Sequence, residues 1–307
     1  MKTIVALIAA LLLSVSLQAS GDLHLFDVEN GDGAITPEKI EEAFSKNGFS
    51  IGLNSEMNTP FKKQFQKTDF KVFTLLTVYH KKLSQDLVKK YPHAGVFVPM
   101  GVGIYQRSNE NTLHVSMLTS DAQAKIVGID DKKIFKSIES DALKVLKSVL
   151  PNAKHRLSED SLKENRDLVT IYELSLDGAD WKDAKEELEM NLENGFNPYG
   201  FVMPSFLDFN DEMSKEGSVE TPFDFYETYS ICKLKVIYTV SKTRPEAAAF
   251  APCTLMVYKK KDEDKIVLGF PGVYNWMSSA RVEDKEAKAT LLKAQKDFES
   301  ILKEITE

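Results

Sequence analysis

The segment at 68–99, TDFKVFTLLTVYHKKLSQDLVKKYPHAGVFVP, recurs at 221–252 as TPFDFYETYSICKLKVIYTVSKTRPEAAAFAP. The two segments align without a gap, and the second begins 153 residues after the first. Aromatic, apolar and proline positions coincide, including Phe70 with Phe223, Val78 with Ile231, Pro92 with Pro245, Phe97 with Phe250 and Pro99 with Pro252. Self-similarity at one fixed offset indicates a duplicated structural unit. The sequence therefore predicts two copies of one fold, with Pro99 and Pro252 at equivalent strand entries.

The repeat extends beyond these segments in both directions. Downstream, Tyr105 aligns with Tyr258 at the same offset. Upstream, KNGF at 46–49 returns as ENGF at 193–196, so the second copy carries a six-residue insertion before its long strand. The predicted units are a first repeat domain at 22–151, a charged linker at 152–166 and a second repeat domain at 167–307.

The same order of elements is predicted in both copies. Each begins with a short strand and a capped helix, for which Thr36 and Pro37 in the first copy and Asp180 in the second are the start signals. Gly48 and Gly195 are expected to end these helices. Five elements follow in the first copy: a long strand at 70–79, a basic helix at 80–91, a proline-bounded return at 92–99, a hairpin at 102–118 and a long amphipathic helix at 134–149. In the second copy the same five elements are expected at 223–232, 233–243, 245–252, 254–270 and 291–305.

Helices at both ends of each copy, with strands between them, indicate an α+β architecture. The apolar positions of each terminal helix share one face, which predicts that the helix covers one side of a sheet. Hairpin connections favour antiparallel pairing. The predicted fold is therefore two repeated domains, each a mainly antiparallel sheet with helices on one face.

The motifs VFVPMGVGIYQ at 96–106 and AFAPCTLMVYK at 249–259 carry a family resemblance. With the long strand, the basic helix and the charged hairpin turn, they resemble the bacterial family called domain of unknown function 302, present as two tandem copies. The resemblance implies a fold like that of the TATA-binding protein. It implies no activity, and likeness of fold is no reason to infer DNA binding.

The N-terminus has the organisation of a secretory signal peptide at 1–19. Lys2 precedes an uncharged run at 3–17, and small residues from Ala19 to Gly21 follow. The run is shorter than the ~20 apolar residues that a membrane-spanning helix needs. Cleavage after Ala19, with no cysteine nearby, predicts a free periplasmic or secreted protein rather than a lipoprotein, with no integral membrane segment. An uncleaved anchor is the alternative.

Charge and loop composition argue against two binding functions. The chain has 39 basic and 46 acidic residues and a formal charge of -7, so we expect no nucleic-acid partner. The stretch DVENGDGAITPEK at 27–39 resembles a calcium loop, but Val28 and Lys39 stand where the first and twelfth ligands are required. A tight turn before a capped helix is the better interpretation.

Cys232 and Cys253 are the one pair of residues whose side chains suggest a particular chemistry, and the first copy has no cysteine. In an oxidising compartment a structural disulfide is favoured, and it would stabilise the fold by roughly 3 kcal/mol. Two buried free thiols are an alternative. So is a thiol-redox or Cu(I) site that includes Met256 or Met277. Both cysteines stand where the resembled family often has them.

The sequence contains no pattern that identifies a reaction. Its five histidines lack ligand spacing, and no phosphate-binding loop, zinc motif, haem motif or nucleophile elbow occurs. We therefore predict no catalytic residue, no metal and no cofactor, and we favour a non-catalytic module that binds a small molecule or a periplasmic protein. Its ligand is expected in a groove between the copies, lined by Tyr105, Tyr258, Tyr274 and Trp276.

Overall fold

The computed structural model describes residues 21–163, 168–215 and 220–307, and the predicted signal peptide lies outside them. The first copy contains β1 (Leu23–Glu29), α1 (Pro37–Lys46), β2 (Phe49–Glu56), α2 (Asn58–Phe65), β3 (Phe70–His80), α3 (Leu83–Lys90), the 3-10 helix η1 (Pro92–Phe97), β4 (Met100–Arg107), β5 (Thr112–Leu118), α4 (Ser120–Ile126) and α5 (Lys133–Val149), followed by β6 (Lys154–Leu157).

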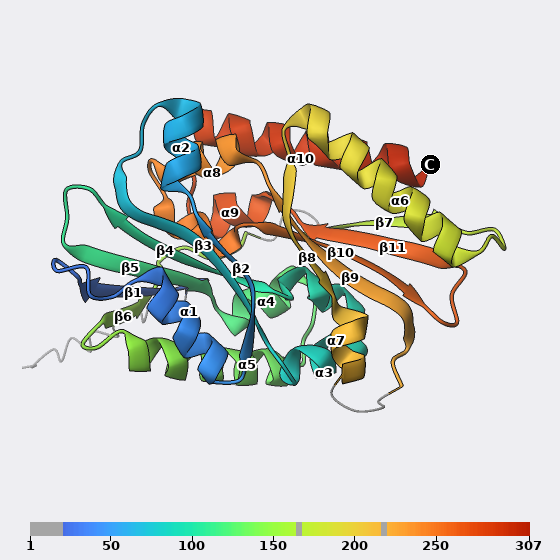
Figure 1. Cartoon of the computed structure of the whole chain (residues 1–307), viewed down its shortest axis with the longest axis horizontal. Helices are drawn as coiled ribbons and strands as arrows, with labels where there is room; N and C mark the ends of the chain where they lie inside the picture. The colour runs from blue at the N-terminus through green and yellow to red at the C-terminus, as the bar shows by residue number, and fades with distance from the viewer. Residues whose placement is uncertain (1–20, 164–167, 216–219) are drawn as a thin grey trace, which may run out of the picture.

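The second copy repeats this order (Figure 1). It contains β7 (Val169–Ser175), α6 (Trp181–Phe196), the 3-10 turn η2 (Asn197–Tyr199), β8 (Val202–Asp208), α7 (Phe209–Lys215), β9 (Phe223–Cys232), α8 (Leu234–Ser241), η3 (Pro245–Phe250), β10 (Cys253–Lys260), β11 (Lys265–Pro271), α9 (Tyr274–Ser279) and α10 (Lys285–Thr306).

The two sheets have the same strand order, and every pairing in them is antiparallel. The first runs β2-β3-β4-β5-β1-β6, and the second runs β8-β9-β10-β11-β7. Tyr105 and Tyr258 occupy the same position in β4 and β10. Pro99 and Pro252 directly precede these strands, each after a cis peptide bond. The prediction that both copies fold alike is confirmed.

The segment at 152–166, predicted as a linker, contributes the sixth strand of the first sheet. Its strand β6 pairs antiparallel with β1, in a register that places His24 opposite Leu157 and Asp27 opposite Lys154. The chain between the two copies is therefore held against the edge of the first sheet. This placement matters for the site, because the residues that follow β6 form part of a cleft wall.

The stretch at 27–39 forms the expected turn and helix start. Oδ1 of Asn30 accepts a hydrogen bond from the N–H of Ile35 at 2.8 Å. Thr36 caps α1 by accepting from the N–H of Lys39, and Pro37 is the first helical residue. Within the described ranges, no group of three or more His, Cys, Asp or Glu residues could hold a metal ion.

Helix α6 is longer than its counterpart α1, with 16 residues against 10. It continues through Gly195, the predicted stop, and ends at Phe196. A Cβ at Gly195 would lie 2.8 Å from Cγ2 of Ile301 on α10. The glycine therefore permits close packing of two helices instead of ending one. Since β8 again begins 153 residues after β2, the extra length of the second copy is taken up by α6 and η2.

Helices cover one face of each sheet, and the other face packs against the other copy. Helices α1, α3 and α5 lie along one side of the molecule, and α6 and α10 lie along the opposite side (Figure 1). One hydrophobic core, around Phe44 and Phe135, fills the space between the first sheet and its helices. A second core joins Phe73 of the first copy to Tyr226 and Phe298 of the second. No helix in the described part of the chain is long and apolar enough to cross a bilayer.

The 3-10 helices form the main contact between the copies. Helix η3 packs on β4 and β5, and η1 packs on β10 and β11. A Cβ at Gly103 would lie 2.6 Å from Cβ of Ala248, and one at Gly95 would collide with the hydroxyl of Tyr226. That hydroxyl donates to the carbonyl oxygen of Pro92 at 2.5 Å. Small residues thus allow each copy to approach the sheet of the other.

Candidate ligand-binding cleft between the two copies

A polar cleft of about 340 Å³ lies between the copies. The first copy supplies β1, β4, β5, β6 and the residues after β6, and the second supplies the start of η3 and the end of α9. Ligand sites are common at domain interfaces and begin at ~300 Å³, so this cleft is the candidate site. Its lining comprises Leu23, Leu25, Asp27, Tyr105, His114, Arg156, Ser158, Glu159, Asp160, Arg244, Glu246, Ser279, Ala280 and Arg281.

Tyr105 is the sequence-predicted residue that lines this cleft. Its side chain is 9% exposed, and its ring stacks on that of His114 with centroids 4.8 Å apart. Burial, helped by the nearby carboxylates of Glu246 and Asp27, raises the pKa of Tyr105 far above its usual value. No described residue makes a hydrogen bond with the Tyr105 hydroxyl. The Tyr105 hydroxyl is therefore available to a ligand in the cleft.

His114 and Asp27 form an oriented pair beside Tyr105. The register of β1 against β5 places the two residues directly opposite each other. Nδ1 of His114 lies 2.6 Å from Oδ1 of Asp27, and Nε2 lies 3.3 Å from Oε1 of Glu110. Both ring nitrogens of His114 face carboxylates, which fixes the orientation of the ring. The pair therefore presents polar groups of fixed orientation to the cleft.

Three arginines from separate segments line the same cleft. Arg156 lies in β6, with its Nε 3.7 Å from Oδ2 of Asp27. Arg244 precedes η3, and its Nε donates to the carbonyl oxygen of Arg281 at 3.1 Å. Arg281 follows α9, and its Nε lies 3.3 Å from Oε1 of Glu283. Because the arginines come from both copies, their arrangement depends on how the copies pack.

The two serines of the cleft are engaged with other groups. Oγ of Ser158 accepts from the N–H of Leu23 at 3.0 Å. Oγ of Ser279 donates to Oδ2 of Asp22 at 2.6 Å, and the N–H of Leu162 reaches the same oxygen at 2.5 Å. Burial raises the pKa of Asp22. These bonds tie the first strand, the segment after β6 and the end of α9 together around the cleft.

The cysteines lie together elsewhere, in the second copy. Cys253 follows the cis peptide and begins β10 opposite Ile231, the neighbour of Cys232. Both thiols are free, and both line a small apolar cavity of about 40 Å³. Burial raises the pKa of each thiol to about 12. The favoured disulfide is not formed, and neither Met256 nor Met277 lines this cavity.

The other three predicted groove residues lie apart from Tyr105. Tyr258 is 2% exposed and stacks on Tyr226 with parallel rings 5.3 Å apart, within the core between the copies. Trp276 lines the cavity of the two thiols. Tyr274 begins α9 and lines neither that cavity nor the polar cleft. The structure therefore brings one of the four aromatic residues to the polar cleft.

An apolar cavity of about 330 Å³ also lies between the copies, where β2 and α2 approach β8 and α8. No charged side chain lines it, and its walls are aliphatic, sulfur-containing and proline residues rather than the expected aromatics. The lining comprises Leu53, Ser55, Met57, Pro60, Gln64, Leu75, Gly200, Val202, Pro204, Cys232, Leu234 and Pro252. Ser55 and Gln64 are the polar side chains in this lining.

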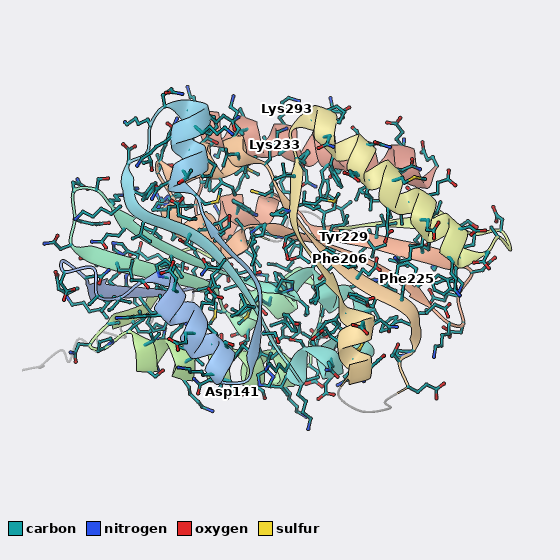
Figure 2. The ribbon with its side chains drawn as sticks, viewed as in Figure 1. Asp141, Phe206, Phe225, Tyr229, Lys233 and Lys293 are labelled. Atoms are coloured by element: carbon teal, nitrogen blue, oxygen red, sulfur yellow. The ribbon has the colours of Figure 1, made fainter. Side chains whose placement is uncertain are left out.

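A buried charged cluster lies on the sheet of the second copy, at the Tyr229 label in Figure 2. Oε1 of Glu227 lies 2.8 Å from Nζ of Lys185, and the Tyr229 hydroxyl donates to Oε2 of Glu227 at 2.8 Å. Burial raises the pKa of Glu227. Thr74 and Leu76 are the equivalents of Glu227 and Tyr229 in the first copy. The cluster is internally paired and lies outside the three cavities described above.

Sequence reasoning missed most of the cleft residues. Asp27 and the three arginines belong to no motif, and His114 was counted among scattered histidines. A signal was present in the differences between the copies: at the 153-residue offset His114 aligns with Val267, and Arg244 aligns with Tyr91. Positions that are apolar or aromatic in one copy and ionisable in the other could have been chosen as candidate site residues on that basis.

The fold and the cleft together define a tandem-duplicated α+β protein whose copies enclose a polar site. The family model described as "Domain of unknown function DUF302" matches residues 28–152 and 180–305. The chain therefore belongs to this family, in two tandem copies, and the resemblance carried by the motifs at 96–106 and 249–259 is confirmed.

Comparisons with individual proteins and solved structures add the following. No curated protein matches the sequence. Among solved structures, the chain is similar to one titled "Crystal structure of uncharacterized conserved protein DUF302 from Bacillus stearothermophilus". The two are 15% identical with a TM-score of 0.37, over 46% of this chain and 100% of that chain.

Proposed function

We propose that the protein is a non-catalytic binding module of the periplasm or cell exterior, whose small polar ligand binds in the cleft between the two copies. The observation that carries this proposal is Tyr105, which lines the cleft and whose hydroxyl makes no hydrogen bond with a described residue. Both copies contribute to the cleft, so the duplication provides a site that one domain lacks.

The two serine hydroxyls of the cleft are already hydrogen-bonded to other groups, and this favours a binding function over a catalytic one. Ser158 and Ser279 both use their hydroxyls in hydrogen bonds that hold the cleft wall. His114 and Asp27 could move a proton, but a covalent reaction also needs an available nucleophile or an activated water. The cleft lining includes no cysteine or lysine. A role in orienting and binding a ligand is what these residues support.

The proposal is tested by screening the mature protein for thermal stabilisation by neutral, cationic and anionic polar molecules, with calorimetry on each hit. We expect a ligand to bind the wild type and to bind Tyr105→Phe about fivefold to tenfold more weakly, because only a hydroxyl is lost. Tyr238→Phe is the matched control, since that ring stacks on Phe65 outside the cleft. Equal affinity in wild type and Tyr105→Phe would contradict the proposed site.

Export is part of the proposal, and the N-terminal sequence supports it. Lys2, the uncharged run and the small residues before Asp22 are typical of a cleaved signal peptide. We expect the intact mass of the protein recovered from the periplasm or medium to lack residues 1–19. A mature mass that still includes residues 1–17 would mean an uncleaved anchor or a cytoplasmic protein.

The thiol-redox or Cu(I) alternative has weaker support. The thiolate is the form that reacts and binds metal, and a pKa of about 12 keeps Cys232 and Cys253 protonated near neutral pH. The Cys232→Ser, Cys253→Ser double variant separates the two functions. Unchanged ligand binding favours the binding module, whereas metal uptake or turnover that is lost in the double variant favours the alternative.

A further inference from the structure

We infer that the ligand of the polar cleft carries an oxyanion, either a carboxylate or a phosphate, and that Arg281 is the residue that selects it. This inference rests on the proposed function, because it concerns the ligand of the same cleft. Two observations carry it: a difference between the copies at one backbone position, and the guanidinium donors that the protein leaves free.

Arg281 stands at a position whose backbone favours glycine. Its φ is +48°, and its equivalent in the first copy is Gly128, with a φ of +68°. The turns are the same: the N–H of Arg281 bonds to the carbonyl of Ser278 at 3.2 Å, and the N–H of Gly128 bonds to that of Lys125 at 3.2 Å. A residue with a Cβ loses free energy in this conformation. The second copy thus holds an arginine where the backbone alone favours glycine.

The guanidinium groups of Arg281 and Arg156 retain free donors. Neither group donates a hydrogen bond to a described residue, although Arg281 has Glu283 at 3.3 Å and Arg156 has Asp27 at 3.7 Å. A guanidinium offers up to five N–H donors in a planar fork that matches two oxygens of a carboxylate or phosphate. Arg281 comes from the second copy and Arg156 from the strand between the copies. Both guanidinium groups therefore line the same cleft, from two different segments of the chain.

Four carboxylates also line the cleft, and two of them are held by other side chains. Asp27 is in contact with His114, and Glu246 lies 3.4 Å from Nη1 of Arg244. Glu159 and Asp160 also line the cleft. Glu159 is exposed, as Arg156 and Arg281 are, so solvent and salt screen all three of these charges. An oxyanion can therefore bind Arg281 without displacing the pairs that hold Asp27 and Glu246, whereas at Arg156 it would share the guanidinium with Asp27, 3.7 Å away.

The duplication creates a second, equivalent set of positions on the other side of the molecule, and these positions lack the arginines and the histidine of the cleft. At the same offset Arg281 aligns with Gly128, Arg244 with Tyr91 and His114 with Val267. The strand that carries Arg156 has no counterpart in the second sheet. Because the same fold is built without guanidinium groups there, the fold does not require them. Their presence in one inter-copy cleft points to a ligand.

The test compares wild type with Arg281→Gly by calorimetry, against acetate, succinate and citrate in one arm and inorganic phosphate and glycerol 3-phosphate in the other. Glycerol and choline represent neutral and cationic molecules. We expect saturable binding in at least one oxyanion arm, and the arm that binds identifies the source of the oxyanion. Arg281→Gly should weaken that binding about tenfold or more while its thermal midpoint stays equal or rises, since glycine suits the backbone.

Two further variants keep the result interpretable. Arg281→Gln retains the Cβ, so weaker binding in this variant assigns the effect to the lost charge. Arg107→Gln is the matched control, because that guanidinium contacts the carbonyl of Lys242 between the copies but lies outside the cleft lining. Binding of glycerol or choline alone, abolished by Tyr105→Phe, would overturn the inference and leave the proposed function in place. Oxyanion binding unaffected by Arg281→Gly, or no binding in either oxyanion arm, would also overturn the inference.

Discussion

At the scale of single residues, the terminal helices of the two copies make a similar contact through side chains of different chemistry. Oε1 of Glu139 accepts from the N–H of Ser120 at 2.7 Å, and Oε1 of Gln295 accepts from the N–H of Val273 at 2.9 Å. Glu139 also lies 2.9 Å from Nε2 of His24. The first copy therefore has an ionisable group where the second has a neutral amide.

The substitution Glu139→Gln should lower the free energy of unfolding at pH 7 by roughly 1 kcal/mol, because the amide keeps the bond to Ser120 and loses the charge. Burial opposes ionisation of Glu139, but hydrogen bonds from His24 and Ser120 outweigh it and lower its pKa. The stabilisation is therefore complete above the unfolded pKa of 4.5 and is lost as the pH falls through the lower folded pKa.

Urea unfolding of wild type and Glu139→Gln across this range tests the prediction. The difference in free energy of unfolding should shrink below the unfolded pKa of Glu139. A difference that stays constant from pH 7 to strongly acidic conditions would show that the charge on Glu139 contributes nothing.

The two thiols should be unreactive in the folded protein. Burial raises the pKa of Cys232 and Cys253 to about 12, so almost no thiolate exists at pH 7. We expect no labelling by a maleimide over minutes under native conditions and two labels per chain in denaturant, counted by mass spectrometry. Rapid native labelling, or an intact mass two hydrogens lower, would instead indicate accessible thiols or a disulfide.

At the scale of elements, η1 and η3 set the distance between the copies. Gly101 and Gly103 lie on β4 beneath η3, and Cβ atoms there would meet the backbone of Ala249 and the side chain of Ala248 within 2.6 Å. The approach is possible because both sides carry small residues. Helix α6 shows the same use of glycine at Gly195, where it packs on α10.

Gly103→Ala should lower the free energy of unfolding by ~1 to 3 kcal/mol, because the added methyl group overpacks the contact between β4 and η3. Gly272→Ala is the control, since the nearest atom to its Cβ would be 3.4 Å away. Urea midpoints of the two variants provide the measurement. If Gly103→Ala were as stable as the control, η3 would not be packed as closely as the structure indicates.

At the scale of the whole molecule, the copies are not independent domains. One continuous core contains Phe73 and Tyr105 of the first copy and Tyr226 and Tyr258 of the second. Each copy alone would expose the face that it now buries against the other. The two copies therefore share one core, and the cleft lies between them.

Separate chains for 22–163 and 168–307 should consequently be unstable. Each would expose a large apolar surface, which favours association. We expect strong binding of the dye ANS and aggregation in sedimentation analysis for each half, with less of both when the halves are mixed. Two monomeric halves that unfold cooperatively and bind little ANS would contradict the continuous core.

The sequence by itself determined the duplication, the α+β class, the order of elements and the positions of Pro99 and Pro252. These features depend on local signals: hydrophobic periodicity, helix caps such as Thr36 and Asp180, and prolines that limit strand entry. Gly195 shows the limit of such signals, because a glycine that ends a helix and one that admits a neighbouring helix look the same in sequence.

Only the tertiary structure decided the site. Tyr105 and Tyr258 are equivalent in sequence, yet one lines a polar cleft and the other stacks in the core. Arg156 and Arg281 are 125 residues apart and line the same cleft because the two copies pack through η1 and η3. The physical reason is that a cleft between copies depends on the relative placement of two whole sheets, which long-range packing sets and local sequence patterns do not encode.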